Sequence, residues 1–435
     1  MINSPFLLIF FFLMLILIGI PISYAMIVAA IGFVLFFGGG IEAIIIPFSR
    51  LGLGFSFPLL AIFFFVQLGN LLNEAKISDY ITDFVRRLTG RFIKHGRTGA
   101  ITILSCAACG PLTGSASGTT FAVGGIMIPQ MNKLGYDPKY STSLLAYSGI
   151  LGSMIPPSIS GLIYAIVVNL SVFTVWMSVF GAGLLYTLSL LITNYIISKK
   201  RNYESYDVSK ESRGDLYKSL IKALPALIIA VSVLGSIYGG IATPTEAGVV
   251  GIFFTLLLGI FYYKTIYSVK QFTKVLYISA YQTAIVMFLV CSSFALSYSL
   301  TVTGTIKAIA QTMLMLSSNG DILLLLTSGL LLVLGCFLDD TPIMILLGPI
   351  VSAILIPVGV HPYHIATVFV YVCMIGLVTP PVGAVLYGAS AVSGINVGNI
   401  LKEIIIFFIP AIVILLLLVF FPEISFFIPK LLGLF

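Results

Sequence analysis

Long apolar runs separated by short polar or glycine-rich breaks dominate the sequence. A helix needs about 20 apolar residues to cross the hydrocarbon core of a bilayer, and such runs recur from one end of the chain to the other. The pattern therefore predicts an all-α, polytopic membrane protein. Spans are expected at residues 6–18, 22–38, 57–74, 139–168, 172–198, 222–238, 246–263, 277–299, 362–392 and 403–421. The first two runs predict two helices joined by a tight reversal, or one long helix kinked at Pro21.

Two apolar regions contain polar sequence at membrane depth. Residues 98–135 include the small, hydroxyl-rich stretch 110–120, and residues 321–358 include Asp339 and Asp340. Irregular backbone at this depth is tolerated only where protein or a cavity surrounds it, so we predict two re-entrant hairpins. For the first region, a seam of small residues between packed helices is the alternative.

Two of the predicted spans are interrupted by a proline pair. Residues 139–168 contain the stretch 152–158, and residues 362–392 contain the stretch 376–383. Proline lacks a backbone donor and breaks a helix, so it frees carbonyl oxygens inside the span. We expect two broken helices whose unwound segments suit a hard cation such as sodium.

Amphipathic sequence predicts two surface helices. Ile77, Ile81 and Val85 recur at helical spacing within residues 76–97, with aspartate and arginine on the opposite face. This pattern is typical of a helix lying along the membrane surface. A second surface helix is expected at residues 303–316.

The sequence repeats itself at a separation of 224 residues. This separation takes Pro138 to Pro362 and Pro156 to Pro380, and it also takes Ser115 to Asp339. An odd number of spans in each half inverts the second copy relative to the first. The predicted division is a first inverted repeat at residues 1–198, a basic cytoplasmic linker at 199–222 and a second inverted repeat at 223–435.

The distribution of basic residues agrees with this topology. With the linker in the cytoplasm, Arg50, Lys307 and Lys430 fall outside, and the other 19 of the 22 lysines and arginines fall inside. Such a bias follows the positive-inside rule. It explains the net charge of +7 better than a nucleic-acid partner does.

Composition narrows the function classes. Hydrophobic residues make up 59% and charged residues 9% of the chain, which excludes a soluble domain. No P-loop is present, so direct ATP coupling is not expected. Cys106 and Cys109 have metal-site spacing without a second pair, and all five cysteines are expected to be buried small residues. His361 and His364 alone do not make a metal site.

The hairpins and broken helices together offer the donors of an ion site. Helix N-termini suit a carboxylate substrate, because their N–H groups and positive dipole ends attract anions. Oxygen donors for sodium come from Ser115, Ser117, Ser153, Ser158, Thr341, Thr379 and Asp339. For any single hydroxyl, a hydrogen bond to its own helix is an equally good explanation. For the intramembrane carboxylate, a functional role is favoured.

Several motifs occur together along the chain: TGSAS at 113–117 followed by GIMIP at 125–129, GYD at 135–137, IPPS at 155–158, YGGIATPTEA at 238–247, FLD at 337–339 and GLVTPPVG at 376–383. They resemble the large membrane subunit of the TRAP (tripartite ATP-independent periplasmic) transporters, the DctM-like proteins. The resemblance implies sodium-driven uptake of a small organic acid (carboxylate) across the bacterial inner membrane by an elevator movement. It also implies a small four-span membrane subunit and a periplasmic substrate-binding protein as partners, and neither enzymatic activity nor a cofactor.

Carried over motif by motif, the resemblance implies two sodium sites. The first comprises Gly114, Ser115, Ser117, Ser153, Pro156 and Ser158. The second comprises Asp339, Thr341, Gly376, Thr379, Pro380 and Gly383. The residues expected near the substrate are Thr119, Thr120, Asp340 and Val385. Family members often have aspartate in place of Thr119 and asparagine in place of Val385, so neither sialic acid nor a C4-dicarboxylate is assumed as cargo.

Two other functions stay open from the sequence. A stand-alone sodium/dicarboxylate elevator carrier would transport without partner proteins. An intramembrane enzyme would use Asp339 to turn over a substrate bond, although adjacent aspartates face different sides of a helix and make a poor catalytic pair.

Overall fold

The computed structural model describes residues 7–37, 45, 57–89, 95–203, 213–266 and 268–435, and the regular elements in these residues are all helices. Six of these helices are long and apolar enough to cross a membrane, or up to eight if each of two bent pairs counts as one span. The chain is therefore an all-α polytopic membrane protein, as predicted.

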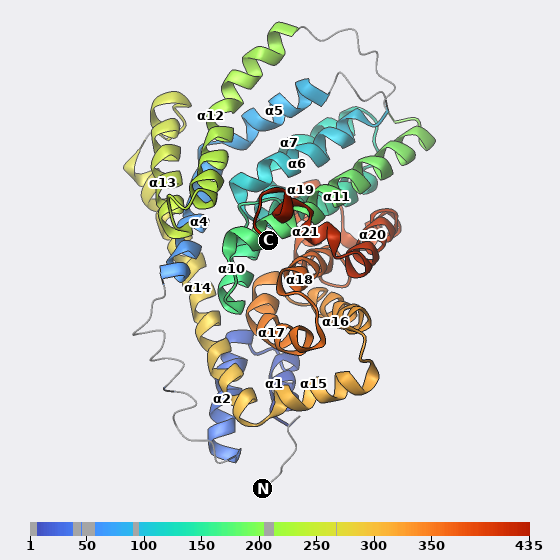
Figure 1. Ribbon diagram of the computed structural model, residues 1–435. Helices are drawn as coiled ribbons and strands as arrows, with labels where there is room; N and C mark the ends of the chain where they lie inside the picture. Colours follow the sequence, from blue (N-terminus) through green and yellow to red (C-terminus); the bar gives the residue numbers. More distant parts are fainter. Residues whose placement is uncertain (1–6, 38–44, 46–56, 90–94, 204–212, 267) are drawn as a thin grey trace.

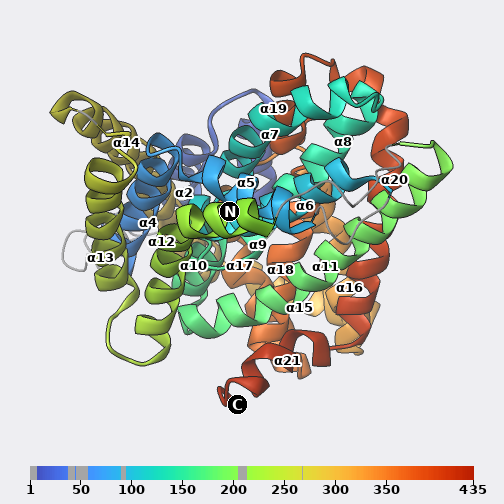
Figure 2. The ribbon, with the colours of Figure 1, turned by 90° about the horizontal axis from the view of Figure 1, so that it is seen from above.

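The helices form an outer layer and a compact body that lie side by side (Figures 1 and 2). The outer layer and the helices next to it are α1 (Leu7–Leu17), α2 (Ile22–Phe37), α4 (Phe57–Glu74), α5 (Ile77–Thr89), α12 (Arg213–Tyr238), α13 (Pro244–Leu257), α14 (Val269–Val302) and α15 (Thr305–Leu316). The body contains α6 (Arg97–Thr113), α7 (Ala116–Lys133), α8 (Pro138–Gly149), α9 (Leu151–Met154), α10 (Ile159–Val168), α11 (Val172–Lys200), α16 (Gly320–Gly335), α17 (Asp340–Leu355), α18 (Pro362–Gly376), α19 (Ala384–Ser393), α20 (Val397–Phe420) and α21 (Glu423–Leu431).

A wholly apolar cavity of about 320 Å³ lies on the boundary between the two groups of helices. Phe12, Leu296 and Met313 line it from α1, α14 and α15, and Leu331 and Ile350 line it from α16 and α17. Packed interiors contain few voids larger than a water molecule. Side chains therefore do not fill this part of the boundary.

The N-terminal apolar region forms two packed helices, α1 and α2, joined by a short turn. Gly19 has φ +94° in this turn, a conformation that favours glycine, and Pro21 precedes the first residue of α2. The tight reversal is confirmed, and the single kinked helix is excluded. The glycine-rich connection at residues 39–56 lies outside the described residues except for Ile45.

The basic stretch at residues 199–222 is more helical than the linker prediction suggested. Helix α11 continues to Lys200, and α12 already begins at Arg213. Ser219, Ala223 and Ala226 are buried at helical spacing, so the packed face of α12 extends from the membrane span into the basic sequence. Residues 204–212 lie outside the described part of the chain.

Both predicted amphipathic helices are present. In α5, Ile77, Ile81 and Val85 are buried, while Asp83 on the other face forms ion pairs with Arg86 and Arg87. Helix α5 turns away from α4 by 69°. Helix α15 occupies the second predicted position, and that both lie on a membrane surface stays a prediction.

Candidate functional site

The first predicted hairpin consists of α6 and α7, joined by a turn at Gly114 and Ser115. Gly114 has φ +62°, and its N–H closes α6 by donating to Gly110 O. Ser115 then begins α7 as its N-cap, with Oγ accepting from the Gly118 N–H at 3.4 Å. The polar sequence thus forms a reversal between two short helices rather than a continuous small-residue seam.

The turn of the first hairpin docks onto the break of the first broken helix. The Ile159 N–H donates to Gly114 O at 2.9 Å, and the Ala116 N–H donates to Ser153 Oγ at 2.9 Å. Ser158 caps α10, and its Oγ accepts from the Gly161 N–H at 3.2 Å. Four of the predicted first-site residues therefore come together: Gly114, Ser115, Ser153 and Ser158.

Glycine permits this close approach. A Cβ atom on Gly110 would lie 3.2 Å from Gly152 Cα, and one on Gly152 would lie 2.6 Å from Ser115 O. Real Cβ atoms essentially never lie so close to a backbone atom as 2.6 Å. We call this place, where α6 passes α9 at Gly110 and Gly152, the first crossing.

The second hairpin and second broken helix meet in the same manner. Cys336 O accepts hydrogen bonds from the N–H groups of Val382 and Gly383, at 3.2 and 3.0 Å. Helix α16 passes α18 at Gly335 and Gly376, where a Cβ on Gly376 would lie 2.6 Å from Gly335 Cα. We call this the second crossing. The separation of 224 residues takes Gly152 to Gly376, so both crossings use a glycine at the equivalent position of the broken helix.

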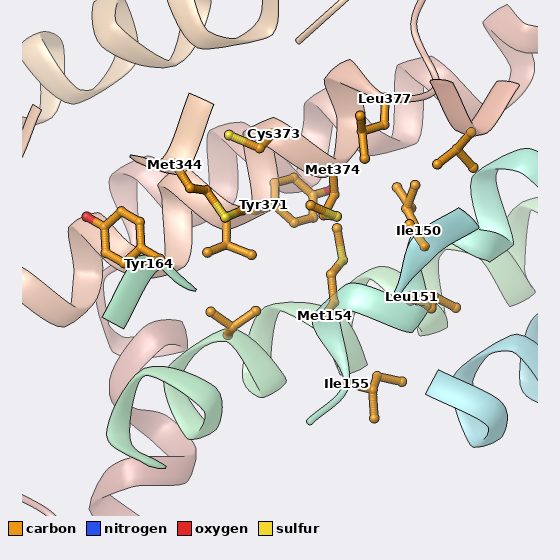
Figure 3. Packing of buried hydrophobic residues seen from close by; sticks show 14 of the residues in the cluster. Ile150, Leu151, Met154, Ile155, Tyr164, Met344, Tyr371, Cys373, Met374 and Leu377 are labelled. Atoms are coloured by element: carbon orange, nitrogen blue, oxygen red, sulfur yellow. The ribbon is translucent and has the colours of Figure 1, made fainter. Parts of the chain in front are cut away.

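The two broken helices also pack against each other in the centre of the body. Met154 from α9 and Met374 from α18 point toward one another within a cluster of buried apolar side chains (Figure 3). Each hairpin also contacts the second half of the other broken helix, α7 with α19 and α17 with α10. The hydroxyl of Tyr164 lies 3.1 Å from Ser352 Oγ across the second of these contacts.

Asp339 begins α17 as its N-cap, and its Oδ1 accepts from the Asp340 N–H at 3.1 Å. The Asp339 residue is exposed, whereas Asp340 and Thr341 are half-buried. Thr341 bonds locally, through its N–H to Asp340 Oδ1 at 2.9 Å. Cys336, three residues before Asp339, contacts the break of α18 and α19. An exposed carboxylate at a helix N-terminus next to this break is available to a cation.

Several predicted site hydroxyls make local hydrogen bonds. Thr379 donates to Ile375 O at 2.7 Å, and Thr120 donates to Ala116 O at 2.9 Å. The Thr119 hydroxyl pairs with that of Thr113. Each of these hydroxyls therefore has a local hydrogen-bond partner, and a hydroxyl that donates its hydrogen keeps oxygen lone pairs that can bind a cation. Their role in a sodium site stays a prediction.

The remaining predicted residues are placed as follows. Ser117 is half-buried on α7, and Val385 is fully buried on α19 with its N–H donating to Leu377 O at 3.1 Å. Pro156 and Pro380 each precede another proline through a cis bond. At the second break, a Cβ on Gly383 would lie 3.0 Å from both Leu377 O and Thr379 O, so carbonyl oxygens converge there.

A polar cavity of about 340 Å³ adjoins the first hairpin. It lies between the α4–α5 turn and the start of α7, and Lys76, Asp79, Gly118 and Phe121 line it. The sequence pattern did not place Lys76 beside the first hairpin. The place of Lys76 could not be predicted from the sequence, because it depends on the bend after α4, where Lys76 has φ +52°.

The cysteines and histidines behave as structural residues. Cys106, Cys109, Cys336 and Cys373 are buried, as expected, whereas Cys291 is only half-buried, so the prediction is wrong for this residue. His364 Nδ1 lies 2.9 Å from Ser425 Oγ. Among the described residues, no group of three or more His, Cys, Asp or Glu side chains is placed to hold a metal ion. An ion bound at either crossing would therefore depend on hydroxyl and carbonyl oxygens with at most the Asp339–Asp340 carboxylates.

Residues 8–424 match the family model of the tripartite ATP-independent periplasmic transporter, DctM component. The chain belongs to this family. It is a permease subunit of the bacterial inner membrane that crosses the membrane several times. The predicted resemblance and localisation are confirmed.

Related proteins in three bacteria match nearly the whole chain. The sialic acid TRAP transporter large permease protein SiaM of Vibrio cholerae is 31% identical over 95% of this chain and 95% of its own length. The C4-dicarboxylate TRAP transporter large permease protein DctM of Pseudomonas aeruginosa is 30% identical over 87% of each chain. The isethionate TRAP transporter permease protein DctMQ of Oleidesulfovibrio alaskensis is 30% identical over 96% of this chain and 65% of its own length.

Proposed function

We propose that this protein performs sodium-coupled uptake of a small organic acid that a periplasmic substrate-binding protein delivers. In this proposal the body of the molecule moves as an elevator against the outer layer. The observation that carries the proposal is the docking of each hairpin turn onto the break of a broken helix, in a chain of the DctM family.

The two crossings supply the right donors for such a cargo. Four helices begin at or beside the crossings: α7, α10, α17 and α19. Their N–H groups and dipoles favour a carboxylate. Carbonyl oxygens at the breaks, serine hydroxyls and Asp339 favour a hard cation such as sodium.

The packing supports relative movement of the two groups of helices. The apolar cavity of about 320 Å³ lies at their boundary, so side chains do not fill the whole of it. Polar cavity residues at the α4–α5 turn, including Lys76 and Asp79, lie beside the first hairpin. We infer that the cargo passes through this cavity on its way from the first hairpin to the cytoplasm.

The partners follow from the relatives. This chain matches 65% of the length of the DctMQ relative, so about a third of that relative lies outside the match, which supports a small membrane subunit as partner. The named cargoes of the three relatives are a sialic acid, a C4-dicarboxylate and isethionate. All are organic acids, so the proposed cargo class is a small organic anion.

Reconstitution tests the proposal. Proteoliposomes would contain this chain with its small subunit, and its binding protein would be added outside with a radiolabelled acid, either sialic acid, succinate or isethionate. We expect uptake of at least one acid that requires an inward sodium gradient. Uptake that persists when potassium replaces sodium would overturn the sodium coupling, and uptake by this chain alone would overturn the tripartite assembly.

A matched pair of variants connects the function to the second crossing. Asp339→Asn removes the carboxylate beside the break, and we expect it to lose sodium-dependent uptake. Asp321→Asn removes a carboxylate from the exposed start of the same hairpin and should transport normally. Equal activity of the two variants would exclude Asp339 from the sodium site.

A further inference from the structure

Among the described residues, two side-chain hydrogen bonds join α10 to α17, and one of them lies next to both candidate sodium sites. The Ser160 hydroxyl, on the first turn of α10, donates to Oδ2 of Asp340, the first residue of α17. Ser160 is 4% exposed and Asp340 is half-buried, so this bond is partly sheltered from water. Hydrogen bonds to an ionised acceptor contribute more than neutral ones, and burial strengthens them further.

One candidate sodium site lies at each end of this hydrogen bond. Ser158, two residues before Ser160, caps α10, and Asp339, directly before Asp340, caps α17. A movement of either cap is therefore transmitted through one helical turn and one hydrogen bond. Asp340 Oδ1 accepts from the Thr341 N–H at 2.9 Å, so the carboxylate is also fixed to its own helix.

Packing of the two units does not require this bond. At the separation of 224 residues, Ser160 corresponds to Ala384 and Asp340 corresponds to Ala116. The equivalent helices α7 and α19 pack against each other although both of these positions are alanine. Small apolar residues suffice where helices pack, so a hydrogen bond to an aspartate on one side alone has another role.

We propose that Ser160 and Asp340 are positioning residues that couple sodium binding at the two crossings. This inference rests on the proposed sodium-coupled function. Sodium bound at the first crossing fixes the start of α10, and the bond then fixes Asp340 and its neighbour Asp339 in the geometry that binds the second ion. By linkage, the second ion raises affinity for the first by the same factor.

The experiment measures sodium dependence in the reconstituted complex. Uptake and thermal stability would be recorded against sodium concentration for wild type, Ser160→Ala, Asp340→Ala and the double variant. We expect Ser160→Ala to raise the sodium concentration for half-maximal uptake about five- to tenfold, within the usual range of coupling between sites. The Hill coefficient for sodium should fall toward one, with the maximal rate unchanged. The double variant should be no worse than Asp340→Ala alone.

Two further variants separate coupling from folding. Ser160→Thr keeps the hydroxyl and should restore the wild-type Hill coefficient. Tyr164→Phe removes the other hydroxyl bond between α10 and α17, the one to Ser352 at 3.1 Å, and should leave sodium cooperativity unchanged. A Ser160→Ala protein that folds and keeps the wild-type half-saturation and Hill coefficient would overturn the coupling. So would an equal loss of cooperativity in Tyr164→Phe. A wild type without sodium dependence would instead overturn the proposed function itself, and the coupling with it.

Discussion

One methyl group at the second crossing should strongly destabilise the protein. A Cβ on Gly376 would lie 2.6 Å from Gly335 Cα and 2.9 Å from its carbonyl carbon. Carbon atoms pack at about 3.5–4.0 Å, so Gly376→Ala must separate α16 from α18 by roughly 1 Å. The obstruction is backbone, and no change of side-chain rotamer can relieve it.

The size of the effect follows from the bonds at this crossing. Separation weakens the hydrogen bonds that Val382 and Gly383 donate to Cys336 O, now 3.2 and 3.0 Å long. Two net hydrogen bonds contribute about 2 kcal/mol, and overpacking costs about 1–3 kcal/mol. We therefore expect Gly376→Ala to lower the free energy of unfolding by about 3–5 kcal/mol.

The buried thiols of the chain provide the assay. Cys106, Cys109 and Cys373 are fully buried, so a thiol-reactive fluorescent dye reports heating-induced unfolding in detergent. Gly329→Ala is the control. Gly329 lies in α16, the helix of Gly335, and a Cβ there meets nothing within 4 Å. It should melt at or above the wild-type temperature, since alanine favours the helix. If Gly376→Ala melted together with the wild type and this control, the glycine contact would not determine the crossing.

Three further outcomes follow from the described contacts. Gly152→Ala should destabilise the first crossing to a similar extent, measured by the same dye, because its Cβ would lie 2.6 Å from Ser115 O. Glu403→Gln should lower thermal stability modestly, by about 1 kcal/mol, since it weakens the 3.0 Å bond from Arg201 that ties the end of α11 to α20. A melting temperature unchanged at low and high salt would contradict this. Thr379→Val should retain sodium-dependent stabilisation, because the carbonyl oxygens of the second break and Asp339 remain as donors; loss of the stabilisation would show that the Thr379 oxygen binds the ion while its hydrogen stays bonded to Ile375 O.

The places where apolar runs are interrupted could be predicted from the sequence. The reversal after α1, the breaks at the two proline pairs and the hairpin turn at Gly114 all lie where glycine and proline interrupt apolar sequence. Proline lacks a backbone N–H donor and glycine permits positive φ. Both effects act locally, so the residue types alone show where the helices are interrupted.

The partners of individual side chains could not be predicted. Ser153 accepts a bond from another helix, whereas Thr379 donates to its own, and both are hydroxyl residues near a proline pair. The choice depends on which helix packs opposite, and this is decided by contacts far apart in sequence. Ser160 and Lys76 were missed for the same reason, since each acquires its role from a segment that the sequence pattern does not place beside it.

The difference in charge between the two crossings gives a physical basis for coupling between sodium and the organic acid. At the first crossing the groups brought together, including Ser115, Ser153 and Ser158, are all uncharged, whereas the second has Asp339. A cation among neutral oxygens in a low-dielectric interior is costly unless an anion accompanies it. On the proposed function, the cargo carboxylate at the nearby helix N-termini supplies that anion. Sodium at the first crossing and the organic acid then stabilise each other, and movement of either one alone is disfavoured.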